Sequence, residues 1–209
     1  SLKNLGIETI DLQQFHVWTD EWAHDERWQR AVDDLKHQGL IRGFGISVNR
    51  WEPTNVLKAL DTGLVDSVQV VYNIFDQNPE DELFPACRER DIAVIARVPF
   101  DEGSLTGTMR PGMTWPQGDW RNLYFSPDKL PEILKRVEEV RRDVPAGMSM
   151  PELALRFILS NPDVATVIPG MRRKLHVETN LGASDGRPLD PELIERLRRH
   201  RWVRTYFVP

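Results

Sequence analysis

The chain of 209 residues is long enough for one large domain or two small ones. Hydrophobic residues make up 40% of it and charged residues 28%, which is typical of globular proteins that bury a sizeable core. The formal net charge of -5 argues against nucleic acid or an anionic membrane as a general partner.

Short apolar runs alternate with longer stretches of helical spacing from the start of the chain. A strand is predicted over residues 9–16, and a helix over residues 26–38, where Trp28, Val32 and Leu35 recur at helical spacing. The next predicted elements are a strand over 41–47, a helix over 53–61, a strand over 66–72, a helix over 79–90 and a strand over 92–98.

A long irregular segment over about residues 99–127 interrupts this alternation. It is rich in glycine and proline, and its large apolar residues favour a structured covering loop. The elements predicted after it are helices over 128–143 and 149–160, a strand over 164–169, and helices over 172–181 and 189–199.

This order of strands and helices predicts an α/β fold of parallel βαβ units with right-handed crossovers. A doubly wound open sheet and a barrel both fit. A complete barrel uses about 250 residues for eight units, so five strands in about 180 residues are not a complete barrel. Without a linker or an internal repeat, we expect a single domain over residues 1–209.

We expect a cytoplasmic protein. The sequence contains no run of about 18 apolar residues, so no transmembrane helix is predicted. Its first residues do not resemble a signal peptide. Cys87, the single cysteine, excludes an internal disulfide, fits a reducing compartment and is interpreted as a small core residue.

His16 and Arg97 end predicted strands, at the edge of a parallel sheet where active sites form. A neutral imidazole there can donate to a carbonyl oxygen or transfer a proton, and a structural histidine is the alternative. A buried guanidinium needs an acid such as Asp101 or Glu102, or a flat π-system on which it stacks.

Amides and hydroxyls occupy the ends of the second and third strands. Ser47 and Asn49 follow the second strand, Gln69 lies in the third, and Tyr72 and Asn73 end it. Such groups suit a polar, uncharged ligand group such as a carboxamide, although Asn and Ser also simply close βα turns.

Three consecutive cations, Arg172, Arg173 and Lys174, stand where a helix is predicted to begin. Cations are disfavoured there because the free N–H groups already make a helix N-terminus positive. A bound anion such as phosphate explains them, and a solvated basic turn is the alternative.

We expect no metal site. Asp20, His24, Asp25 and Glu26 lie close in sequence, but their spacing matches no ligand pattern. The sequence also lacks the GxGxxG, Walker A, HExxH and GxSxG motifs.

Taken together, these segments resemble the aldo-keto reductases in the order of that family. The matching strings are LGIETIDLQQFHVW, LKHQGLIRGFGISVN, VDSVQVVYN, DIAVIARVPF with SLTG, ELALRFIL and VIPGMRRKLHVETN. The resemblance implies a (β/α)8 TIM barrel, of which this chain carries strands four to eight with their helices. It also implies reduction of an aldehyde or ketone to an alcohol with NADPH, NADH being the other cofactor considered.

The resemblance also implies roles for single residues. His16 matches the catalytic histidine that orients the substrate carbonyl. Ser47, Asn49 and Gln69 match the residues that hold the nicotinamide carboxamide, although Val48 separates the usual Ser-Asn pair.

Eight further positions match cofactor contacts of the family. Arg97 stands where many members place an aromatic residue that stacks on nicotinamide. The loop over the pyrophosphate is matched by Phe100, Gly103 and Leu105. The adenosine and 2′-phosphate region is matched by Arg172, His176, Thr179 and Asn180, with His176 where an arginine is common.

The catalytic Asp, Tyr and Lys of the family lie in its first three βα units and have no match here. Tyr72, Tyr124 and Tyr206 do not correspond to the proton donor. We therefore expect this sequence to be part of a longer reductase of a small carbonyl substrate. The alternative is a non-catalytic nucleotide-binding or regulatory subunit. By itself the chain exposes two sheet edges, which predict self-association.

Four tryptophans in loops can either wall a substrate pocket or pack loops onto the barrel. They are Trp18, Trp22, Trp115 and Trp120.

Overall fold

A computed structural model describes residues 1–49 and 52–204 of the chain. The chain forms two compact units. The first unit consists of Ser1–Val71, Asn78–Arg97 and Asp163–Thr166. The second unit consists of Tyr72–Gln77, Val98–Pro162 and the described part of Val167–Pro209. Tyr206 lies outside the described residues, and the single domain over residues 1–209 stays a prediction.

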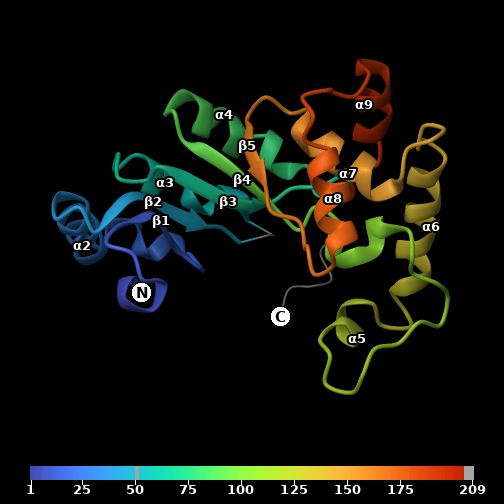
Figure 1. The fold of residues 1–209 in the computed structure, drawn as a ribbon, viewed down its shortest axis with the longest axis horizontal. Coiled ribbons are helices and arrows are strands. Elements are labelled where there is room, and N and C mark those ends of the chain that lie inside the picture. Colours follow the sequence, from blue (N-terminus) through green and yellow to red (C-terminus); the bar gives the residue numbers. More distant parts are fainter. Residues whose placement is uncertain (50–51, 205–209) are drawn as a thin grey trace. The chain divides into compact units, whose positions relative to one another are not determined.

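The five predicted strands are confirmed as one sheet with the order β1-β2-β3-β4-β5 (Figure 1). The strands are β1 (Ile10–Phe15), β2 (Ile41–Ser47), β3 (Ser67–Val71), β4 (Ala93–Arg97) and β5 (Val164–Val167). The pairs β1–β2, β2–β3 and β3–β4 are parallel. Strand order follows chain order without the reversal that defines a doubly wound sheet, so the barrel-type arrangement is favoured.

Helices follow the strands largely as predicted. Those of the first unit are α1 (Leu2–Leu5), α2 (Glu26–His37), α3 (Leu57–Leu60) and α4 (Leu83–Glu89). Those of the second unit are α5 (Arg121–Tyr124), α6 (Leu130–Arg141), α7 (Met150–Leu159), α8 (Lys174–Gly182) and α9 (Pro191–Arg198). None of the helices that the structure describes is long and apolar enough to cross a membrane.

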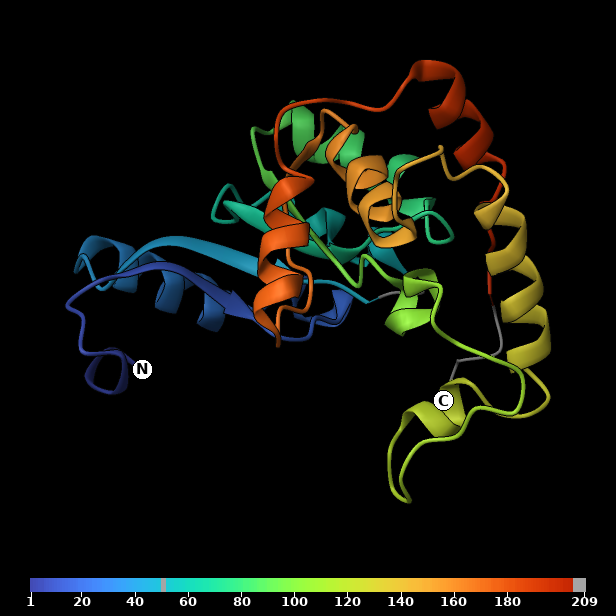
Figure 2. The same cartoon turned by 45° about the vertical axis from the view of Figure 1, so that its right-hand side comes forward.

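Short 3₁₀ helices account for the main differences from the prediction. They are η1 (Asp20–His24), η2 (Pro53–Val56), η3 (Asn78–Glu80) and η4 (Asp101–Thr106). The helices predicted over 53–61 and 79–90 each begin as such a turn. The segment predicted to be irregular contains η4 and α5, and α5 lies in the long loop before α6 (Figure 2).

One face of the sheet packs against helices. Phe44 of β2 stacks on Trp28 of α2 at 5.8 Å between ring centroids. Val68 of β3 and Val94 of β4 are fully buried. Cys87 of α4 is also fully buried, and burial raises the pKa of its thiol to about 12, which confirms it as a core residue.

On the other face, small and polar side chains form one row. The parallel register places Gln14, Gly45, Ser67 and Ala93 in one row across four strands. A Cβ atom on Gly45 would lie 2.3 Å from Ser67 Oγ and 2.9 Å from Gln14 Cγ. A larger residue at this position would therefore force the side chains of Ser67 and Gln14 to move.

The core of the second unit is formed mainly by α6 and α7. Ile133 and Val140 of α6 and Leu153 and Ile158 of α7 are fully buried. Phe157 of α7 stacks on Tyr72 at 5.8 Å.

The substitution Gly45→Ala tests how tightly the row of Gln14, Gly45, Ser67 and Ala93 is packed. Overpacking against Ser67 should lower the free energy of unfolding by about 1–3 kcal/mol in urea denaturation. Gly182→Ala is the matched control, because a Cβ atom there meets nothing within 4 Å. Equal stability of the two variants would contradict the close approach at Gly45.

Candidate functional site

The ends of four strands in the first unit surround one pocket of about 290 Å³. Five of the residues selected from the sequence line it together, namely His16, Ser47, Asn49, Gln69 and Arg97. Three further residues, Val17, Trp18 and Val48, complete the lining.

The strand register explains why these side chains meet. Ser47 of β2 is paired with Gln69 of β3, and Gln14 of β1 is paired with Gly45 of β2. His16 comes two residues after Gln14, so it reaches the level of Ser47 on the same side. Arg97, at the end of β4, is paired with Val71 of β3, two residues beyond Gln69. Polar groups thus gather where the strands end.

Val48 and Asn49 differ in what they present to a ligand. The side chain of Val48 is 2% exposed, and its backbone N–H donates to the carbonyl oxygen of Gln69 at 2.9 Å. Its own carbonyl oxygen accepts from Arg97 Nη2 at 3.2 Å. Asn49 is exposed. Asn49 therefore offers the accessible polar group, while Val48 anchors Arg97.

Trp18 lines the pocket and also packs against its neighbours. It is 6% exposed and packs edge-on against Trp28 at 5.5 Å. Its indole N–H donates to the carbonyl oxygen of Asn55 at 3.1 Å. Among the others, Trp115 stacks on Phe125, while Trp22 and Trp120 are 41% and 51% exposed.

Phe100, Gly103 and Leu105 lie in the second unit, at the loop after β4. The carbonyl oxygen of Phe100 accepts from the N–H groups of Gly103 and Leu105 at 2.9 and 3.0 Å. Val98, immediately before this turn, has φ 58°. That conformation is an outlier for a β-branched residue and costs about 1–3 kcal/mol. Such strain often marks a functional segment.

The basic segment precedes and opens α8 of the second unit. Arg172 and Arg173 come before the helix, Lys174 is its first residue, and all three are exposed, as is His176. No side chain caps the helix start. The N-terminal end of α8 is therefore positively charged and accessible to an anion.

Thr179 and Asn180 make bonds within the second unit. Thr179 Oγ1 donates to the carbonyl oxygen of Leu175, one helical turn earlier, at 2.8 Å. Asn180 is 8% exposed, and its Nδ2 donates to the carbonyl oxygen of Gly170 at 3.3 Å. Both residues thus hold local structure at α8, and their assignment to a cofactor stays a prediction.

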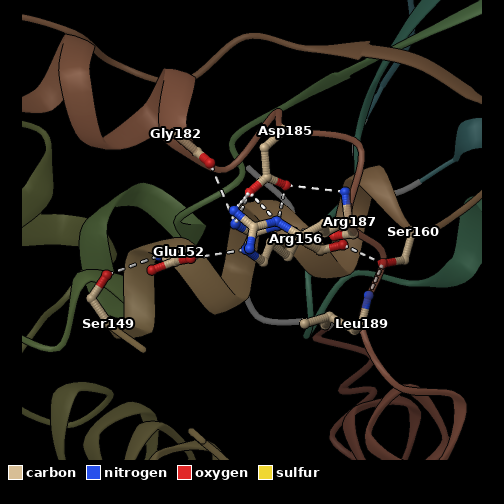
Figure 3. Close-up of polar contacts among 8 residues, drawn as sticks. All are labelled: Ser149, Glu152, Arg156, Ser160, Gly182, Asp185, Arg187 and Leu189. Carbon is tan, nitrogen blue, oxygen red and sulfur yellow. Dashed lines mark hydrogen bonds and ion pairs between the residues drawn. The ribbon is translucent and has the colours of Figure 1, made fainter. Parts of the chain in front are cut away.

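Arg156 of α7 fixes the C-terminal end of α8 (Figure 3). Its guanidinium donates to both carboxylate oxygens of Asp185, at 2.8 and 2.9 Å. It also donates to Glu152 Oε1 at 2.9 Å and to the carbonyl oxygens of Gly182 and Arg187 at 3.3 and 2.9 Å. Five hydrogen bonds therefore join one side chain to α7, α8 and the loop after α8.

This polar anchor is needed because α8 has little apolar packing. Leu175 and Leu181 are 63% and 62% exposed, and Asn180 is its buried residue. The ELALRFIL string matches the family, but no role was inferred from the sequence for its Arg156. The available signal was an arginine one turn after Glu152 in an otherwise apolar helix, opened by the Ser149 cap.

The acids considered for a metal are used otherwise. Asp25 caps α2 and pairs with Arg27 at 2.7 Å, and Asp20 pairs with Lys58. Within residues 1–49 and 52–204, no group of three or more His, Cys, Asp or Glu side chains is arranged to hold a metal ion.

Asp185 makes the stability of the second unit depend on pH. The hydrogen bonds from Arg156 and then from the backbone N–H of Arg187 hold the pKa of its carboxyl well below the ordinary value. Because the folded-state pKa is lowered, the stabilisation is present above the unfolded pKa of about 4 and is lost as the pH falls below it. Asp185→Asn should lower the Tm by several degrees at pH 7, and its difference from the wild type should shrink below about pH 4.

Asp119→Asn is the control, because Asp119 forms a similar pair with Arg121 inside one loop. It should change the Tm little. A pH-independent difference between Asp185→Asn and the wild type would rule out the charge as the cause.

Comparison with known proteins places this arrangement in a family. The Aldo/keto reductase family matches residues 1–201. The uncharacterized oxidoreductase YqkF of Bacillus subtilis is 33% identical over 96% of this chain and 63% of its own length. Aldo-keto reductase yakc [NADP(+)] of Schizosaccharomyces pombe is 30% identical over 88% of this chain and 55% of its own length. The chain thus spans less than two thirds of these relatives.

Solved structures agree with the sequence comparison. The holo form of aldo-keto reductase AKR11C1 from Bacillus halodurans superposes with a TM-score of 0.78 at 26% identity, covering 99% of this chain and 64% of that protein. The glycerol dehydrogenase AKR11B4 of Gluconobacter oxydans gives a TM-score of 0.80 at 25% identity, over 95% of this chain and 60% of that protein. The parallel five-stranded sheet is thus that of the aldo-keto reductase barrels, and the chain belongs to the aldo/keto reductase family.

Proposed function

We propose that this chain is the cofactor-binding part of an NADPH-dependent reductase that converts a small aldehyde or ketone to an alcohol. In this proposal it supplies strands four to eight of a (β/α)8 barrel. The observation that carries it is the pocket that joins His16 to Ser47, Gln69 and Arg97. Membership of the family and the partial coverage of its relatives support it.

The donor set of the pocket fits a nicotinamide carboxamide, which presents one acceptor and two donor hydrogens. The hydroxyl of Ser47 and the amides of Asn49 and Gln69 provide both kinds of partner. Arg97, held through the carbonyl oxygen of Val48, offers a flat cation against which an aromatic ring stacks. When bound, the reduced nicotinamide of NADPH would supply the hydride.

His16 is proposed to orient the substrate. It lies just after β1, exposed, on the side of the sheet that carries Ser47 and Gln69. A neutral imidazole at that position donates a hydrogen bond to the carbonyl oxygen, where negative charge develops during reduction. The Asp, Tyr and Lys of the family have no match in this sequence, so we propose that the proton donor belongs to the preceding units of the barrel.

The cationic start of α8 favours NADPH over NADH. One relative is named for NADP(+), whereas another, from Escherichia coli, is named as an NADH-specific methylglyoxal reductase. Relatives named for either cofactor are thus similarly related to this chain. The preference between NADPH and NADH is therefore expected to depend on side chains near the 2′ position of the cofactor. Arg172, Arg173 and Lys174 present three charges there, and His176 adds a further donor.

The substitution Arg172→Ala tests the preference for NADPH over NADH. Loss of a charge-assisted bond to phosphate should raise the dissociation constant of NADPH by about tenfold or more, while that of NADH stays nearly constant. Quenching of tryptophan emission on titration of the full chain measures both constants. Arg142→Ala, which removes an exposed cation just after α6, is the control. An equal loss for both cofactors would place Arg172 away from the 2′-phosphate.

Removal of the imidazole tests the catalytic assignment. In the longer reductase that includes the proposed proton donor, His16→Ala should lower kcat by about 10²-fold or more, because orientation and polarisation of the carbonyl are lost. The dissociation constant of NADPH should change little. His24→Ala is the matched control, since His24 lies in η1 outside the pocket lining. Unchanged turnover in His16→Ala would remove this residue from the mechanism.

A further inference from the structure

A buried ion cluster in the second unit joins Arg204 to the loop after β4. Arg204 Nη2 lies 2.8 Å from Asp76 Oδ2 and 2.8 Å from Asp101 Oδ1. The side chains of Arg204 and Asp101 are 0% exposed and that of Asp76 is 8% exposed. Asp76 and Arg204 are 128 positions apart in the sequence. One guanidinium therefore connects distant segments in a site shielded from water.

Asp101 is the point at which this cluster reaches the loop. Besides Arg204, its carboxylate accepts from Ser104 Oγ at 2.6 Å and from the hydroxyl of Tyr124 at 3.1 Å. Arg204 Nη1 in turn donates to the hydroxyl of Tyr124 at 3.3 Å. The carboxylate is thus held from three sides, and its position fixes the first residue of η4.

The loop needs such support because its backbone is strained. Val98, Asp101 and Glu102 have φ of 58°, 45° and 56°, a region that side chains other than glycine rarely adopt. Gly103 follows with φ 110°. Residues in these conformations persist only where the surrounding structure over-determines them.

The start of the strained segment is tied to the same cluster by a second route. Asn73 Nδ2 donates to the carbonyl oxygen of Val98 at 3.1 Å and to Asp76 Oδ2 at 3.0 Å. Val98 is therefore linked to Asp76 through Asn73, and Asp101 is linked to Asp76 through Arg204. Both routes meet at one carboxylate.

We propose that Arg204 is a positioning residue for the cofactor, acting through Asp101 on the loop that presents Phe100, Gly103 and Leu105. This inference rests on the proposed function, in which the loop folds over the pyrophosphate. Without the guanidinium, two buried carboxylates face each other with no charge to balance them, so Asp101 moves towards water and the strained turn relaxes. Arg204 itself contacts neither cofactor nor substrate in this arrangement.

The test compares Arg204→Met and Arg204→Lys in the longer reductase that includes the preceding barrel units, so that kcat can be measured. Methionine keeps the approximate length of the side chain without its charge, whereas lysine keeps a cation that can lie between the two carboxylates. Arg136→Met is the matched control. Arg136 stacks on the same Trp202 ring as Arg204, at 4.4 Å against 4.8 Å, but its ion partner is Glu132.

Four quantities are measured. They are the dissociation constant of NADPH, its dissociation rate, kcat at saturating NADPH, and hydrogen exchange along the backbone. Arg204→Met should raise the dissociation constant of NADPH by about tenfold through faster dissociation. The value of kcat at saturating NADPH should stay within about twofold of the wild type. The N–H groups of Gly103 and Leu105, which donate to Phe100, should exchange faster, and saturating NADPH should restore their protection. Arg204→Lys should recover most of the affinity, and Arg136→Met should resemble the wild type.

A milder variant covers the case in which Arg204→Met does not fold. Tyr124→Phe removes one hydrogen bond to Asp101 and one from Arg204, and should give the same pattern with a smaller amplitude. Unchanged NADPH affinity in both variants, or faster exchange spread evenly over the chain, would overturn the proposal. If the wild type binds neither NADPH nor NADH, the proposed function fails instead, because no cofactor is then present to be positioned.

Discussion

The parallel register of β1 to β4 is the constraint from which the candidate site follows. At Gly45 this register places the side chains of Ser67 and Gln14 where a Cβ atom would stand. Once this row is fixed, the period of two along each strand brings Ser47 and Gln69 to one level, and His16 to the same side. The pocket is thus a consequence of backbone hydrogen bonding, and its polar groups need no further element to bring them together.

The second unit is held by a different kind of interaction around its functional segments. Apolar packing forms its core in α6 and α7, but α8 and the loop after β4 are fixed by buried or half-buried charges. Arg156 anchors the end of α8 through Asp185, and Arg204 anchors the loop through Asp101. Ion pairs of this kind add little net stability compared with apolar packing, but they are directional, and removing one partner is costly. They hold the two segments that are proposed to contact the cofactor.

The residues proposed to contact a cofactor stand on different kinds of backbone in the two units. Those proposed for the nicotinamide lie at strand ends in the first unit, where the backbone is regular. Those proposed for the phosphates lie in a strained loop and at a helix start in the second unit.

The sequence by itself determined the strands, the order of the elements and the residues that end each strand. Alternating apolar patterns and turn residues are local signals, so β2 was predicted at its observed bounds and Ser47, Gln69 and Arg97 were placed at one edge. Within the stretch predicted to be irregular, η4 and α5 were missed because its glycines and prolines indicate irregular backbone. The tertiary structure alone decided the roles of Gly45, Arg156 and Arg204. A local pattern points only to the Glu152 partner of Arg156. The other partners lie in distant segments, 29 positions away for Arg156 and Asp185 and 128 for Arg204 and Asp76, and no local pattern reports those pairings.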